Sequence, residues 1–175
     1  YLFGLFDFKK NGVIRKDDFM ELAAKISEEL HLPTDKSLAA KESSYTFFRR
    51  MVEDMDPDAQ YEVHLEKWLS FFDEQIVNND DPQTMEEYAN LILGYIFGYF
   101  DDNKDGFISV QEYDHMFATL GMSELHAGVA FHGIDKNNDE RLSRYELIMA
   151  VESFLTSDDP KNSDNWVFGD PLLEK

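Results

Sequence analysis

The stretch of sequence that decides the fold is DDNKDGFISVQE, which occupies residues 101–112. Oxygen-bearing side chains stand at alternate positions, as Asp101, Asn103 and Asp105, and Glu112 closes the stretch. Alternate spacing allows a short loop to direct several oxygen atoms toward one point, which is the arrangement that a hard divalent cation requires. The stretch therefore predicts a metal-binding loop.

Calcium is the cation that this spacing fits best, because the stretch matches the pattern D-x-[DN]-x-[DN]-G-x5-E at every specified position. Calcium takes about six to eight oxygen ligands at roughly 2.3–2.6 Å. Gly106 allows the chain to reverse direction at positive φ, and the closing glutamate can offer both carboxylate oxygens. The predicted ligands of this loop are Asp101, Asn103, Asp105, the carbonyl of Phe107, Ser109 and Glu112.

The end of the loop also predicts the start of a helix. Ser109 and Glu112 form the sequence S-x-x-E, a capping box that predicts an exiting helix from Val110. Ile108 supplies no ligand, and we expect it in a short strand that pairs with the same position of a partner loop. Metal binding and helix formation are therefore coupled through the same residues.

The residues around this loop recur along the chain. The segment 97–101 is echoed at 3–7 and 131–135, and more faintly at 52–56. Each repeat predicts a helix–loop–helix unit, and such units pair because each exposes an apolar face that its neighbour covers. We expect an all-α fold of four units in two lobes, with short β pairing through the eighth loop position, which is occupied by Ile14, Val63, Ile108 and Leu142.

A second complete loop occupies residues 135–146. Its one departure from the pattern is Glu140 at the glycine position, where a residue with a side chain must adopt a left-handed conformation at a cost of about 1–2 kcal/mol. We expect this loop to bind metal more weakly than residues 101–112. Its predicted ligands are Asp135, Asn137, Asp139, the carbonyl of Arg141, Ser143 and Glu146.

The first repeat contains a degraded loop at residues 7–18. Lys9 occupies a ligand position and must swing outward, because a cation there repels the metal ion. Arg15 occupies the ninth position, and Asp18 replaces the closing glutamate with a carboxylate one methylene shorter. We expect weak or absent binding in this loop, and the sequence leaves open whether it retains any metal.

The second repeat contains a loop, residues 56–67, that has lost the metal pattern. Tyr61 stands at the glycine position and Lys67 at the closing position, so we expect no metal there. Val63 can still pair with Ile14. The apolar residues that follow are expected to pack into the core, and they are Leu65, Leu69, Phe72 and Ile76.

A polar, turn-rich segment at residues 78–82 predicts the boundary between the two lobes. Residues 1–79 would form the N-terminal pair, with its first loop degraded and its second loop not binding. Residues 80–156 would form the C-terminal pair, in which both loops bind metal. Residues 157–175 carry a Trp, a Phe and two Leu close together, which favours a tail that packs back on the core.

The composition limits the kinds of partner. The 175 residues include 36 Asp and Glu against 16 Lys and Arg, and the net charge of −20 repels nucleic acid and anionic membranes. No apolar run approaches the roughly 20 residues of a membrane span, and without cysteine neither disulfides nor zinc–thiolate sites are expected. We expect a monomeric cytoplasmic protein that binds calcium ions; the sequence identifies no protein partner.

The sequence resembles the invertebrate sarcoplasmic calcium-binding proteins of the EF-hand superfamily over nearly its full length. The resemblance rests on four loops with a decayed second loop, on the pattern DKNND at residues 135–139, and on the terminal WVFG at residues 166–169. It implies a compact cytosolic buffer of calcium and magnesium that binds through the first, third and fourth loops. Lys9 and Arg15 depart from a binding first loop, so we expect two calcium sites, with magnesium competing for them.

Other functions remain open beside that of a buffer. A calcium sensor or regulator must expose an apolar, often Met-rich groove for a target protein, whereas the 7 Met here are scattered. A photoprotein or luciferin-binding protein has the same two-lobed shape, but it needs a large cavity lined by aromatic side chains. Two tryptophans, Trp68 and Trp166, are too few to favour such a cavity. No nucleophile stands beside a base in a recognisable motif, so we do not expect an enzyme.

Overall fold

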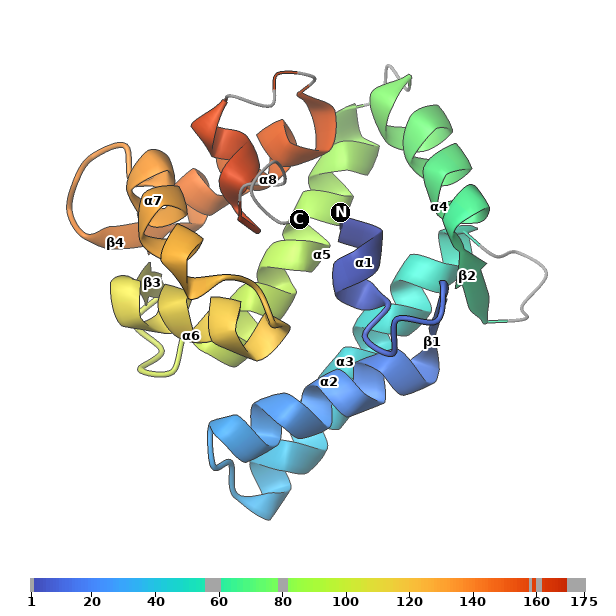
Figure 1. Ribbon diagram of the computed structural model, residues 1–175, viewed down its shortest axis with the longest axis horizontal. Helices are drawn as coiled ribbons and strands as arrows, with labels where there is room; N and C mark the ends of the chain where they lie inside the picture. Colours follow the sequence, from blue (N-terminus) through green and yellow to red (C-terminus); the bar gives the residue numbers. More distant parts are fainter. Residues whose placement is uncertain (1, 56–60, 79–81, 158, 160–161, 170–175) are drawn as a thin grey trace. The chain divides into compact units, whose positions relative to one another are not determined.

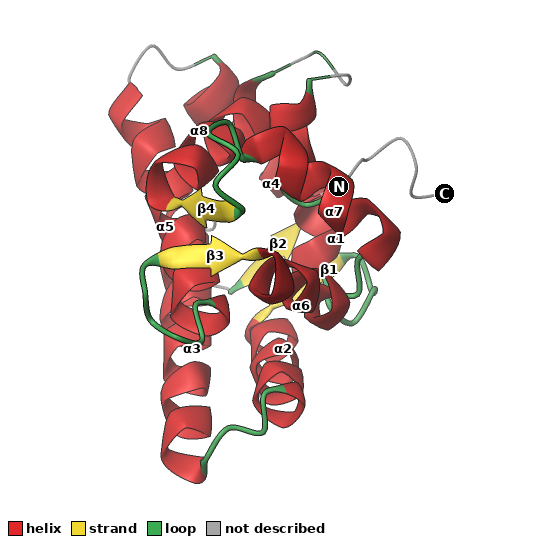
Figure 2. Ribbon diagram, turned by 90° about the vertical axis from the view of Figure 1, so that its left-hand side faces the viewer, coloured by secondary structure: helices red, strands yellow, loops and turns green. Residues whose placement is uncertain are grey.

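The computed structural model describes residues 2–55, 61–78, 82–157, 159 and 162–169. This part of the chain is mostly helical, with eight α-helices and two pairs of short strands (Figures 1 and 2). The predicted helical class with short strand pairing is thus confirmed. The chain divides into two compact units, Tyr1–Asn78 and Asn79–Lys175. None of the described helices combines the length and the hydrophobicity that crossing a membrane requires.

The first unit is built around an antiparallel pair of strands. Ile14 pairs with Val63, as their shared loop position predicts, and both side chains are fully buried. Helices α2 and α3 pack side by side on either side of the turn at Pro33 (Figure 1). The elements are α1 (Leu2–Phe6), β1 (Val13–Arg15), α2 (Lys16–Glu29), α3 (Thr34–Met55), β2 (Glu62–His64), α4 (Leu65–Phe72) and a π-helical turn (Asp73–Val77).

The packing of α4 differs from the expectation in one respect. Trp68 and Ile76 are buried, but Leu65 and Leu69 are 46% and 58% exposed. The π-helical turn after α4 closes wider hydrogen-bonded rings than an α-helix does, so the spacing that relates Leu65 and Leu69 to Ile76 is no longer that of one helical face. The prediction that these two leucines pack into the core was wrong.

The second unit repeats the strand pairing. Strands β3 and β4 are antiparallel, and Ile108 pairs with Leu142 at the register that the repeat predicts (Figure 2). The elements are α5 (Pro82–Phe100), β3 (Phe107–Ser109), α6 (Val110–Leu120), α7 (Glu124–Ile134), β4 (Arg141–Ser143), α8 (Arg144–Thr156) and a 3₁₀ turn, η2 (Ser163–Trp166).

The ends of these helices follow from their capping residues. Both predicted capping boxes are formed, so α6 begins after Ser109 and α8 begins after Ser143. Gly121 ends α6 in the left-handed conformation, with φ of 73°. Ser123 stands at the N-cap position of α7, but its side chain makes no capping hydrogen bond.

The residues after α8 pack against the helices of the second unit. The η2 turn contacts α8 and α7, and Val167 and Phe168 are buried. The hydroxyl of Tyr113 in α6 donates a hydrogen bond of 2.8 Å to the buried carbonyl of Val167. Residues 163–169 therefore cover apolar surface of this unit, while the end of the predicted tail, residues 170–175, lies outside the described residues.

Candidate metal centre

The third and fourth loops of the chain, residues 101–112 and 135–146, have the same backbone path. Position 4 is left-handed in both, with φ of 58° at Lys104 and 56° at Asn138. Position 6 is also left-handed, with φ of 82° at Gly106 and 62° at Glu140. The expectation that Glu140 adopts this conformation is confirmed.

Backbone amides of the third loop orient its carboxylate and amide oxygens. The two carboxylate oxygens of Asp101 accept hydrogen bonds from the N–H groups of Asp105 at 3.1 Å and Gly106 at 3.0 Å. The N–H of Asp105 also donates to the side-chain oxygen of Asn103 at 2.8 Å, and the N–H of Phe107 donates to the Asp105 carboxylate at 2.9 Å. These backbone donors therefore orient the side chains at positions 1, 3 and 5 of the loop.

Glu112 joins the two ends of the third loop. One carboxylate oxygen accepts from the N–H of Asp102 at 2.9 Å, beside the first ligand position. The other accepts from the N–H and the hydroxyl of Ser109, both at 2.8 Å. The closing carboxylate therefore lies at the opening of the loop while it also caps helix α6.

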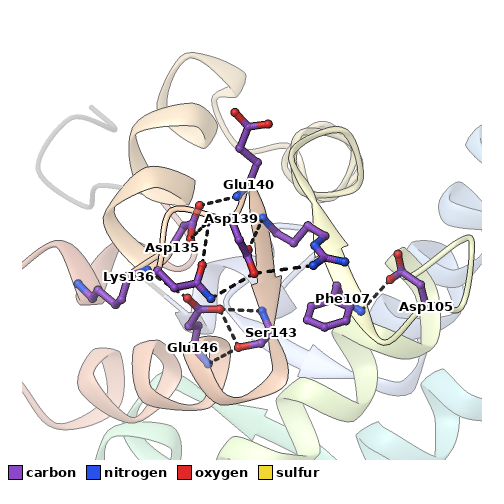
Figure 3. A network of polar contacts seen from close by, with 10 residues as sticks. Asp105, Phe107, Asp135, Lys136, Asp139, Glu140, Ser143 and Glu146 are labelled. Atoms are coloured by element: carbon purple, nitrogen blue, oxygen red, sulfur yellow. Dashed lines mark hydrogen bonds and ion pairs between the residues drawn. The ribbon is translucent and has the colours of Figure 1, made fainter.

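The fourth loop repeats this arrangement (Figure 3). The Asp135 carboxylate accepts from the N–H groups of Asp139 at 3.2 Å and Glu140 at 3.0 Å. The side-chain oxygen of Asn137 accepts from the N–H of Asp139 at 2.8 Å, and the Asp139 carboxylate accepts from the N–H of Arg141 at 3.1 Å. Two loops with different sequences thus hold the same oxygen positions with the same amide donors.

Glu146 closes the fourth loop as Glu112 closes the third. It accepts from the N–H of Lys136 at 3.1 Å, from the N–H of Ser143 at 2.9 Å and from the Ser143 hydroxyl at 2.7 Å. Burial alone would raise the pKa of this carboxyl, but the hydrogen bonds from Ser143 and from backbone amides outweigh burial and lower the pKa. Glu146 is therefore held in the charged form that a cation requires.

The chemistry of both donor sets fits a hard cation, because every predicted ligand atom is oxygen. The side-chain positions are less complete: nowhere in the described chain do three His, Cys, Asp or Glu side chains converge closely enough to hold a metal. In both loops the asparagine at position 3 bonds to the carboxylate at position 5: the side-chain nitrogen of Asn103 donates to Asp105 at 3.1 Å, and that of Asn137 donates to Asp139 at 3.2 Å. These amide groups occupy carboxylate oxygens that a cation would use.

The structure places all twelve predicted ligand residues in these two loops of one unit. Phe107 and Arg141, which are predicted to offer carbonyl groups, stand at the starts of β3 and β4. Strand pairing between β3 and β4 joins the two loops at their seventh to ninth positions.

Sequence reasoning missed that the first loop shares much of this arrangement. The Asp7 carboxylate accepts from the N–H groups of Asn11 at 3.0 Å and Gly12 at 2.8 Å. Asp18 accepts from the N–H groups of Lys9 and Arg15, both at 2.8 Å. The retained residues Asp7, Asn11, Gly12 and Asp18 were the available signal, because they occupy the positions that organise the loop backbone.

The side chain of Lys9 turns away toward helix α2, as its charge predicts. Its ammonium group lies 3.2 Å from the Glu21 carboxylate and 3.6 Å from that of Asp17. The hydrogen bond to Glu21 raises the pKa of Lys9. The first loop therefore lacks the third-position oxygen that the other two loops have.

Comparison with known proteins gives two relatives by sequence, while no protein-family model matches the chain. Calerythrin of Saccharopolyspora erythraea is 28% identical over 159 residues, which cover 87% of this chain and 86% of calerythrin. The luciferin-binding protein of Renilla reniformis is 25% identical over 171 residues, which cover 95% of this chain and 88% of that protein.

Solved structures show the same fold. A calcium-binding protein of Streptomyces coelicolor matches with a TM-score of 0.72 at 18% identity, over 89% of this chain and 93% of that chain. A sarcoplasmic calcium-binding protein from amphioxus matches with a TM-score of 0.67 at 15% identity, over 94% of this chain and 90% of that chain. The chain is therefore similar to calerythrin in sequence, and it has the EF-hand fold of the sarcoplasmic calcium-binding protein from amphioxus.

Proposed function

We propose that this protein binds two calcium ions, one in each loop of the second unit, and buffers calcium and magnesium. The supporting observation is the hydrogen-bond network that both loops share, which orients the oxygens at positions 1, 3, 5 and 12. In this proposal the chain consists of four helix–loop–helix units paired into two lobes. The first loop binds weakly or not at all, and the second does not bind.

The residues that would hold each ion have distinct tasks. The carboxylates at positions 1, 5 and 12 supply the charge that a divalent cation requires, and the asparagine at position 3 supplies a neutral oxygen. A bound ion would replace the asparagine N–H₂ as the partner of the position 5 carboxylate. The position 12 glutamate is predicted to bind through both oxygens, and it accepts a hydrogen bond from the hydroxyl of Ser109 in one loop and of Ser143 in the other.

The packing of the residues after α8 supports a buffer over a sensor. A sensor needs an apolar groove that opens for a target helix when calcium binds. Here Val167 and Phe168 are buried against the second unit, and Tyr113, next to Glu112, bonds to the Val167 carbonyl. A segment of the chain itself thus covers apolar surface next to the third loop.

Calorimetric calcium titration with and without millimolar magnesium tests this proposal. We expect two sites whose apparent calcium affinity falls in magnesium, and one site in Glu112→Gln. The binding of an apolar fluorescent dye should rise little on calcium addition, whereas a large rise would favour the sensor or regulator. Absence of calcium binding in the wild type would refute the proposal.

A second candidate function is favoured by the match to the Renilla reniformis luciferin-binding protein, which spans 95% of this chain. In that case the protein would bind a luciferin, and coelenterazine is a suitable probe because a solved coelenterazine-binding protein has the same fold. Titration with coelenterazine, followed by its absorbance, separates the two functions. Stoichiometric binding of coelenterazine would establish the second candidate, and no spectral change is expected for a buffer.

A further inference from the structure

The Arg141 side chain touches both loops of the second unit. Its guanidinium carbon lies 4.4 Å from the centroid of the Phe107 ring in the third loop. Its terminal nitrogen lies 3.9 Å from the carboxylate of Asp139 in the fourth loop. Figure 3 shows Phe107 beside the network that contains Asp139. The guanidinium group of Arg141 thus contacts both an aromatic ring of the third loop and a predicted metal ligand of the fourth loop.

These contacts connect positions that matter for metal binding. Asp139 stands at position 5 of the fourth loop and bears one of its three predicted carboxylate ligands. Phe107 stands at position 7 of the third loop, where its carbonyl is a predicted ligand. Arg141 in β4 pairs with Ser109 in β3, so the register of the two strands places the arginine beside the strand that contains Phe107.

A cation bound in the fourth loop changes what Arg141 can contact. The Asp139 carboxylate would then coordinate the metal ion, and the guanidinium of Arg141 would be repelled by that ion at short range. The face of the Phe107 ring remains as an attractive surface for the displaced guanidinium, because aromatic faces carry negative electrostatic potential. Tighter stacking on that ring would order the third loop at the residue whose carbonyl completes its site.

We propose that Arg141 is a positioning residue that couples the two metal loops, so that an ion in one loop raises the affinity of the other. The inference rests on the proposed function, because it requires both loops to bind. Coupling between sites is reciprocal. Arg141 therefore transmits the effect in either order of binding, through Asp139 in one direction and Phe107 in the other.

Arg144 provides a matched control in the same loop. It also contacts the helix that leads into the third loop, with a hydrogen bond of 3.1 Å to Asn90 and a distance of 5.9 Å to the Phe97 ring. None of these contacts includes a predicted metal ligand. Arg144→Gln therefore removes one positive charge and one arginine–aromatic contact without breaking the connection between Asp139 and Phe107.

The test is the pair of stepwise calcium constants, measured by calorimetry on the full chain. Arg141→Gln should lower the ratio of the second constant to the first by about two- to fivefold, the range expected for an exposed cation–π contact. Phe107→Leu should lower the ratio similarly, and the double variant should lower it no further. Arg141→Lys should keep only part of the coupling because it lacks the planar stack, and Arg144→Gln should keep all of it.

Two other outcomes would overturn the inference in distinguishable ways. An unchanged ratio in Arg141→Gln, with both constants shifted equally, would show that the arginine affects local charge and does not couple the loops. A wild type that binds no calcium would refute the proposed function, and the coupling with it. Circular dichroism checks that each variant is folded. If Arg141→Gln does not fold, Arg141→Lys, which keeps the positive charge, takes its place in the test.

Discussion

Single residues set the difference between the two complete loops. Glu140 holds φ of 62° at the position where the third loop has Gly106 with φ of 82°. The sequence predicted this strain from the glycine position alone. It could not predict that Lys104 and Asn138 also adopt positive φ, because the motif leaves position 4 unspecified.

The strain at Glu140 predicts a stabilising substitution. Glu140→Gly should raise the free energy of unfolding by about 0.5–1 kcal/mol, because the left-handed strain it removes exceeds the extra backbone entropy of glycine. Urea denaturation of the metal-free protein measures the change. Gly106→Glu should act in the opposite direction, and a destabilised Glu140→Gly protein would contradict this account of the backbone.

The hydrogen bond from Ser143 predicts a change in pH dependence. The pKa of Glu146 is lowered in the folded protein, so its contribution to stability is present above the ordinary glutamate pKa and lost as pH falls through the lowered value. Ser143→Ala removes the capping hydroxyl and should cost about 1 kcal/mol at neutral pH. The same substitution should raise the pKa of Glu146 toward its ordinary value. The variant should therefore lose less stability than the wild type when the pH falls.

Urea midpoints across the acid range test this prediction. The difference between wild type and Ser143→Ala should shrink as pH falls below the ordinary glutamate pKa. Ser109→Ala removes the equivalent cap and the equivalent hydrogen bond to Glu112 in the third loop, and should cost about the same at neutral pH. A constant difference at all pH values would show that Ser143 does not act through Glu146.

At the scale of helices and strands, local sequence signals were sufficient where one motif determined the geometry. The capping boxes positioned the starts of α6 and α8, and the eighth loop position predicted both strand pairs. The signals failed at α4, where the π-helical turn that follows interrupts the regular spacing. Nothing in the periodicity of Leu65 and Leu69 indicates that interruption, because each residue taken alone suits a buried helix face.

The contact between α6 and the segment after α8 predicts a loss of stability. Tyr113→Phe removes a buried hydrogen bond of 2.8 Å and leaves the Val167 carbonyl without that donor. The expected cost is about 1–3 kcal/mol in the free energy of unfolding, measured by urea denaturation. Tyr145→Phe serves as the control because Tyr145 is exposed, and equal effects of the two substitutions would contradict a role for the hydrogen bond.

For the whole molecule, charge and metal binding are linked. The net charge of −20 includes three carboxylates in each complete ligand set, which repel one another in the absence of a cation. The sequence indicated the two complete loops through their matching residues. It did not reveal the hydrogen bonds that the degraded first loop shares with them, because those bonds are donated by backbone amides that no side-chain pattern records.

The crowded charge predicts how ions affect stability. Calcium should raise the thermal midpoint well above its value in chelator, since an ion that binds only the folded state stabilises it by mass action. Added sodium chloride should raise the thermal midpoint of the protein in chelator, because salt screens the repulsion between its carboxylates. It should raise the midpoint of the calcium-loaded protein by a smaller amount. Differential scanning calorimetry measures all four conditions, and equal midpoints with calcium and chelator would refute the prediction.

The most direct test of the central claim is a count of bound calcium ions by native mass spectrometry. The wild type should carry two ions at saturation, Glu112→Gln and Glu146→Gln one each, and the double variant none. A third ion on the wild type that is lost in Asp18→Asn would show that the first loop binds despite Lys9. Two ions on the double variant would contradict the assignment of the sites to the third and fourth loops.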